Sequence, residues 1–111
     1  MTPRLTAEFW VHAYLTRLRL HDVPAFVVAR GDATAGAVIV KQSPLDGTAS
    51  LHQRQFDPLA DRREWVRVAQ GPEPEIDARI ARERGRDPDL WVIEVEDRAA
   101  RSFLDEPGLE G

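Results

Sequence analysis

Two glutamates, Glu94 and Glu96, have the residue type and spacing that best suit chemistry. They lie two positions apart in an apolar segment typical of a strand, so both carboxylates point to one face, about 7 Å apart. Such a pair can bind a divalent cation, or one carboxyl group can have a raised pKa. The alternative interpretation is that both are exposed at a strand end and pair with Arg98 or Arg101.

Lys41, the only lysine of the chain, and Arg67 are the cations that can complete such a site. At the end of an apolar strand, Lys41 can act as an anion ligand or as a desolvated amine. Alternatively, its stem covers apolar surface while its ammonium group stays in water. Glu94, Glu96, Lys41 and Arg67 together define one hypothesis, a small ligand-binding domain or enzyme with a pocket on the floor of a sheet.

Other catalytic patterns are missing from the sequence. The absence of cysteine excludes thiolate zinc sites and cysteine nucleophiles. His12, His21 and His52 are scattered and have no metal-ligand spacing. Gly31 and Gly36 do not have the spacing of a nucleotide fingerprint. We therefore expect no catalytic residue, no cofactor and no metal, which favours a protein that is not an enzyme.

Charge and length limit the classes of protein that remain. The 111 residues carry a net charge of -4, with 19 acidic and 15 basic side chains. This balance argues against a general nucleic-acid binder, and the length suits a single domain. No apolar run approaches the roughly 20 residues of a membrane-spanning helix. Residues 1–8 lack the basic and apolar regions of a signal peptide, so a cytoplasmic protein is expected.

The elements that must position these residues follow the order α-β-β-β-β-α-β-α. Apolar patterning and turn residues place helices at 6–21, 74–84 and 98–104, strands at 25–30, 36–42, 48–56, 64–69 and 90–96, and a frayed tail at 106–111. Strands 25–30 and 36–42 are expected to form a hairpin that opens a four-stranded meander. The predicted fold is α+β, with a five-stranded, mainly antiparallel sheet and the helices packed on one face.

The expected core lies at the centres of the most apolar strands. Strand 25–30 is almost continuously apolar, which favours a central strand covered on both faces. The residues expected to be buried are Val27, Ile39, Val66, Val92 and Ile93. The chain also has three tryptophans, Trp10, Trp65 and Trp91, which either pack in this core or line a groove for a peptide or small ligand.

The first helix has more apolar surface than one sheet face can cover. Beside its main apolar arc it carries a second strip, made of Phe9, Ala13 and Leu20. Either Phe103 and Leu104 cover this strip, or it is exposed and marks an interface. In the second case a twofold homodimer is the simplest solution. This strip is the positive reason for the leading hypothesis, a non-enzymatic binding or protein-interaction module that self-associates.

Several segments resemble the domain-of-unknown-function family 1491, a set of short alphaproteobacterial proteins. The resemblance covers nearly the whole chain and is carried by 87–98, 101 and 103–104, by 30–32 with 35–41, by 45–47, and by Trp10, 14–15 and 23–24. It implies a cytoplasmic, single-domain bacterial protein and brings no activity, cofactor or catalytic residue. One departure is Ala100, where family members often have glycine, a difference that bears on how the last helix begins.

Overall fold

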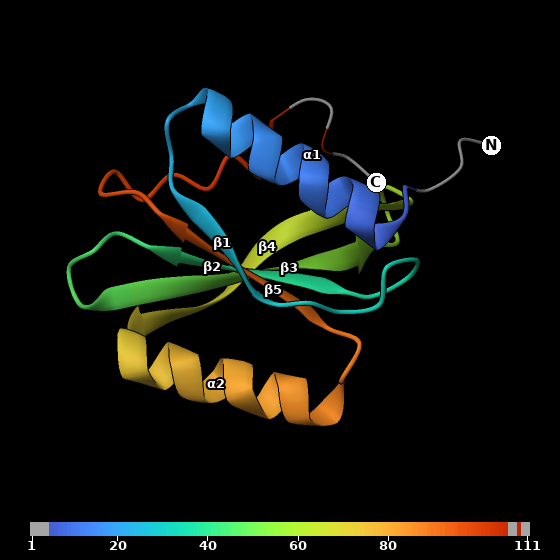
Figure 1. The fold of residues 1–111 in the computed structure, drawn as a ribbon. Coiled ribbons are helices and arrows are strands. Elements are labelled where there is room, and N and C mark those ends of the chain that lie inside the picture. Colours follow the sequence, from blue (N-terminus) through green and yellow to red (C-terminus); the bar gives the residue numbers. More distant parts are fainter. Residues whose placement is uncertain (1–4, 107–108, 110–111) are drawn as a thin grey trace.

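The computed structural model describes residues 5–106 and residue 109, which form an α+β fold with a five-stranded sheet, as the sequence predicts. The sheet is mixed, with three antiparallel strand pairs and one parallel pair. Helix α1 and helix α2 lie on either side of the sheet (Figure 1). The elements in chain order are α1 (Ala7–Leu20), β1 (Ala25–Ala29), β2 (Val38–Ser43), β3 (Thr48–Asp57), β4 (Arg62–Pro72), α2 (Glu73–Arg86) and β5 (Trp91–Glu96).

Local sequence signals set the ends of α1. The Thr6 hydroxyl caps the first turn by accepting a hydrogen bond from the Phe9 backbone N–H, with 3.2 Å between the two atoms. The helix stops at Leu20, and Asp22 adopts a left-handed conformation with φ 56°. Pro24 follows two residues later, so the chain cannot resume the helix and instead enters β1.

The sheet order β1-β5-β2-β3-β4 differs from the predicted meander at one point. Strands β2, β3 and β4 are antiparallel neighbours, but β5 lies between β1 and β2. The predicted hairpin of β1 with β2 is therefore wrong. The crossover through α2 returns the chain to the middle of the sheet, where β5 runs parallel to β2 and antiparallel to β1.

This order makes β1 an edge strand, although its sequence favours a central one. Val27 is 42% exposed, so its predicted burial is wrong, and Val66 on the other edge strand is only half-buried. Ile39, Val92 and Ile93 are buried, as predicted. An apolar run shows that a strand can be buried, whereas its place in the sheet depends on the tertiary context.

The two helices cover opposite faces of the sheet, so the prediction that they pack on one face is wrong (Figure 1). The physical reason is that β2 and β5 are apolar on both faces, and each face needs a cover. The core on the α1 side includes Trp10, Val11, Tyr14, Leu18, Val40, Trp91, Ile93 and Val95. The core on the α2 side includes Ile39, Leu51, Ile76, Ile80 and Val92.

The third helix predicted at 98–104 does not form. The Asp97 carboxylate caps a turn by accepting a hydrogen bond from the Arg101 backbone N–H at 2.9 Å. Ala100 and Phe103 both have φ 59°, a left-handed conformation that breaks a helix. At position 100, glycine would adopt this conformation at less cost than the alanine that is present.

The segment after β5 packs against α1 and forms no helix. The Tyr14 hydroxyl donates a hydrogen bond to the Ser102 carbonyl oxygen at 2.7 Å, and the Trp10 indole N–H donates to that of Leu109 at 2.9 Å. In the segment predicted to be a frayed tail, Leu109 is buried and Glu106 pairs with Arg17 at 2.6 Å. Residues 107–108 and 110–111 of that segment lie outside the described residues.

Candidate functional site

Lys41 is buried between the sheet and α2, with only 6% of its side chain exposed. Its ammonium nitrogen lies 2.7 Å from a carboxylate oxygen of Glu73, 2.7 Å from one of Asp77 and 3.1 Å from one of Glu94. Glu94 reaches it because β5 runs beside β2 with Lys41 opposite Glu94. Glu73 and Asp77 are one turn apart at the start of α2 and reach Lys41 from the helix that covers this face of the sheet.

These carboxylates decide the protonation state of Lys41. Burial alone lowers the pKa of Lys41, but hydrogen bonds to Asp77, Glu73 and Glu94 outweigh burial and raise the pKa above its ordinary value. The ammonium group is therefore charged and held, and does not supply a free amine for nucleophilic attack. The alternative interpretation of the sequence, in which the ammonium group stays in water, is wrong because the side chain is buried.

The structure brings together only part of the site predicted from the sequence. Lys41 and Glu94 are in contact, and Glu96 lies on the same face of the sheet, two residues further along β5. Arg67 lies on the opposite face, because it pairs across the strands with His52, which pairs in turn with the core residue Val40. No single pocket can contain all four residues.

Glu73 and Asp77 belong to this cluster but have no distinctive signal in the sequence. Acidic residues in the first turns of a helix are expected for the helix dipole alone. Only the packing of α2 over β2 shows that they face a lysine. Within residues 5–106 and 109, no group of three or more histidine, aspartate or glutamate side chains could hold a metal ion.

The second apolar strip of α1 is exposed at its two ends, while Ala13 also packs against the core. Phe9 is 60% and Leu20 is 76% exposed, and Ala13 between them is half-buried. The two residues that were candidates to cover the strip are engaged elsewhere. Phe103 stacks on the ring of His21, with 4.3 Å between the centroids, and Leu104 is buried in the core.

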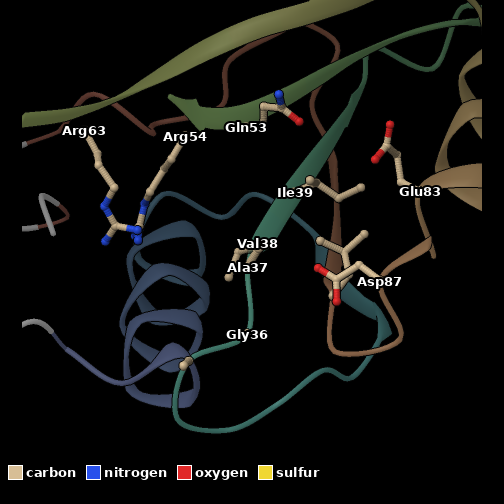
Figure 2. Close-up of a pocket in the computed structure, with 11 residues that line it drawn as sticks. Gly36, Ala37, Val38, Ile39, Gln53, Arg54, Arg63, Glu83 and Asp87 are labelled. Carbon is tan, nitrogen blue, oxygen red and sulfur yellow. The ribbon is translucent and has the colours of Figure 1, made fainter. Parts of the chain in front are cut away.

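A third feature is a pair of arginines at the β3–β4 hairpin. Figure 2 shows the guanidinium groups of Arg54 and Arg63 pointing toward one another at one side of a cavity of about 340 Å³. The same two side chains line adjoining cavities of about 300 and 620 Å³. Patterning placed Arg54 in a weak polar strand and Arg63 in a loop, so the sequence carried no signal that would bring them together.

Stacking on tryptophans holds Arg54 in place. Its guanidinium carbon lies 4.7 Å from the ring centroid of Trp10 and 5.0 Å from that of Trp65. The two rings are themselves stacked, with centroids 5.2 Å apart. Trp10 and Trp91 are buried, as the core-packing interpretation expects, and Trp65 packs at the edge of the core beside a cavity.

The described part of the chain has no helix with the length and apolar character needed to cross a membrane. No curated protein matches the chain. Solved structures, in contrast, do match the chain. A crystal structure of a DUF1491 family protein from Caulobacter crescentus CB15 is 40% identical, with a TM-score of 0.81, and the match covers 93% of this chain and 95% of that one. An NMR structure of a DUF1491 family protein from the same bacterium is 39% identical, with a TM-score of 0.80, over 96% of this chain and 97% of that one.

A more distant structure has the same fold. The solution structure of protein Atu0922 from A. tumefaciens is 33% identical, with a TM-score of 0.71, over 85% of this chain and 86% of that one. The family model described as "Protein of unknown function (DUF1491)" matches residues 5–105, nearly the whole chain. The resemblance seen in the sequence is thereby confirmed, and the chain belongs to the DUF1491 family.

Proposed function

We propose that the protein is a non-enzymatic protein-interaction module of the bacterial cytoplasm and that it forms a homodimer through the outer face of α1. The observation that carries this proposal is the exposure of Phe9 and Leu20, 60% and 76%, on a face that the rest of the described chain leaves open. Large apolar side chains grouped on one exposed helix face are typical of an interface.

The spacing of this face suits pairing with a second copy. Phe9, Ala13, Thr16 and Leu20 follow one another at intervals of four, three and four residues, so they lie along one side of the helix. In an antiparallel pair about a twofold axis, Phe9 of one copy faces Leu20 of the other, and Ala13 faces Thr16. The small central residues allow the two helices to approach closely.

The charges of α1 favour the same antiparallel arrangement. Its first turn carries Glu8 and its last turn carries the exposed Arg19, so antiparallel pairing brings opposite charges together at both ends. A parallel pair would place like charges side by side. The cluster around Lys41 supports the non-enzymatic part of the proposal, because its only amine is held by three carboxylates.

Sedimentation equilibrium across the micromolar range tests the dimer. The expected mass is twice the 12.5 kDa of one chain. The double variant Phe9→Asp/Leu20→Asp should sediment as a monomer with an unchanged circular dichroism spectrum. Leu59→Asp is the matched control, because Leu59 is 97% exposed at the β3–β4 turn, outside the proposed α1 face.

Two results would contradict the proposal. One is a wild-type monomer at every concentration. The other is a Phe9→Asp/Leu20→Asp variant that stays dimeric while Phe26→Asp, on the exposed edge strand β1, becomes monomeric. That second result would move the interface from α1 to the edge of the sheet, where strand pairing rather than helix packing would hold the copies together.

A further inference from the structure

We propose that the open edge of β1 is a docking site for an extended segment of a partner protein. The segment adds to the sheet as a further strand, is apolar along β1 and carries a carboxylate side chain that meets Arg19. The strand β1 is the last on its side of the sheet and pairs only with β5. This inference does not rest on the dimer proposed above, because it uses the edge of the sheet rather than the outer face of α1.

The backbone of β1 has hydrogen-bonding groups that no strand of the described chain uses. The Glu96 backbone N–H donates to the Pro24 carbonyl oxygen at 2.9 Å, so position 24 faces β5. Backbone groups alternate in direction along an antiparallel ladder, so Phe26 also faces β5, whereas Ala25 and Val27 face away from the sheet. The N–H and carbonyl groups of these two residues lie at strand spacing, which an extended backbone matches.

The side chains along this edge are apolar and exposed. Phe26, Val27 and Val28 are between 42% and 52% exposed, and β1 contains no charged residue. The opposite edge strand, β4, has the charged side chains with which proteins usually protect an edge from pairing, namely Arg62, Arg63, Glu64 and Arg67. The register shifts between Val27 and Ala29, so a regular ladder ends at Val27 and the site suits a short segment.

A cavity of about 380 Å³ lies beside the start of this edge, between α1 and β1. Its wall includes Leu15 and Arg19 from α1 and Ala25 from β1. Val27 points to the same side of the sheet, because it pairs across the strands with the core residue Ile93. Alternate side chains of an added strand point to this side as well, so one of them enters the cavity.

The charges at this cavity indicate which side chain the segment carries there. Arg19 is exposed and makes no ion pair with any described residue. It lies one turn after Leu15, so both side chains reach the cavity from the helix. Asp22 also lines the cavity, but it belongs to the turn before β1 and lies beyond the end of the ladder. An acidic side chain over the cavity therefore meets Arg19 first, whereas a basic one meets a like charge.

Hydrogen exchange followed by NMR tests the site residue by residue. The probe is the peptide acetyl-Asp-Val-Thr-Val-Thr-Val-amide. At a peptide concentration of about ten times its Kd, exchange of the Ala25 and Val27 amides should slow by about tenfold. The Phe26 amide, which faces β5, should change less and serves as the internal reference. The same peptide with N-methyl groups on two adjacent central residues lacks a donor on each edge and should not bind.

Charge variants test the acidic side chain. Replacing the Asp of the peptide by Lys should weaken binding by about two- to fivefold, the size expected for an exposed ion pair. Arg19→Gln should remove this preference and leave the circular dichroism spectrum unchanged. Asp22→Asn is the matched control and should not weaken binding of the Asp peptide, because it removes a like charge from the cavity wall.

A backbone variant tests the pairing itself. Val27→Pro removes one outward donor and leaves the ladder with β5 in place, since proline is tolerated where an edge N–H faces solvent. It should weaken binding of the Asp peptide by about two- to tenfold.

Four results would overturn the proposal. The Asp peptide does not bind, the N-methylated peptide binds equally well, or Arg19→Gln keeps the preference for Asp over Lys. The fourth is slow exchange of Ala25 and Val27 in the protein alone, becoming slower as the protein concentration rises. That result would assign the edge to a second copy of the chain. A dimer formed through α1 leaves these two amides unprotected, so the two proposals can fail separately.

Discussion

The buried ammonium group of Lys41 makes three ion pairs, two that link the sheet to α2 and one that joins β2 to β5 within the sheet. Removing such a group from water is costly, and the cost is offset only when its donors are satisfied, as they are here. The partners differ in exposure. Glu94 is 23% exposed and Asp77 is 55% exposed, so solvent weakens the pairs with α2 more than the pair within the sheet.

The variant Lys41→Met should lower the free energy of unfolding by about 2 to 4 kcal/mol, because it leaves Glu94 facing Glu73 and Asp77 without a cation. Urea denaturation measures this change. Glu96→Gln, on the same strand and face, is the control and should change stability by no more than about 0.5 kcal/mol. If Lys41→Met were as stable as the wild type, the ion pairs would contribute nothing to folding.

The sign of the pH dependence follows from the raised pKa of Lys41. A basic group with a raised pKa in the folded state stabilises the fold fully at every pH below its unfolded value, here 10.5. That contribution is lost only as the pH rises further, through the folded pKa. The difference in stability between wild type and Lys41→Met should therefore be constant from neutral pH to about pH 10.

At the scale of the elements, β1 does not take the central place in the sheet that its sequence suggests, whereas β5 lies inside the sheet. Both are short apolar strands, but β5 has neighbours on both sides and β1 has one. Val92 on β5 is fully buried, whereas Val27 on β1 is 42% exposed. The same residue type thus occupies two very different environments, one covered by α2 and one open to solvent at the edge of the sheet.

This difference predicts unequal costs for the same substitution. Val92→Ala should lower the free energy of unfolding by about 1.5 to 3 kcal/mol, from the lost burial and the cavity that remains. Val27→Ala, its matched control, should lower it by no more than about 1 kcal/mol, because solvent fills the space. Chemical denaturation of both variants gives the comparison, and equal losses would contradict the edge position of β1.

At the scale of the whole molecule, the sheet has an apolar layer on each face, one closed by α1 and one by α2 (Figure 1). The segment after β5 completes the first layer, where Leu104 and Leu109 are buried against α1. Two such layers stabilise a domain of this length without a disulfide or a metal. The chain has no cysteine to form a disulfide.

The whole fold should therefore be indifferent to metal removal. Thermal midpoints measured with and without EDTA are expected to agree, because the carboxylates that could bind a cation, such as Glu94, are engaged by Lys41. A fall of several degrees in EDTA would contradict this and would point to a cation at Glu94 and Glu96. A sharper test adds calcium to the Lys41→Met variant. This variant lacks the ammonium group that competes with a cation for the carboxylates.

Short-range patterns in the sequence determined the elements and the family. The capped helix at 7–20, the strand at 91–96 and the second helix were predictable because caps, turn residues and apolar periodicity act over a few residues. The shared face of Glu94 and Glu96 followed from strand geometry alone. The helix predicted at 98–104 failed because the same local signals do not show the left-handed backbone at Ala100 and Phe103.

Only the tertiary structure decided which elements became neighbours. The insertion of β5 between β1 and β2, the opposite placement of the helices and the meeting of Arg54 with Arg63 all join segments that are remote in the chain. Such pairings depend on the balance of burial over the whole sheet, and the sequence of a single strand does not specify that balance. Lys41 illustrates both levels. Its strand was predictable, but its carboxylate partners on α2 appeared only once that helix crossed the sheet.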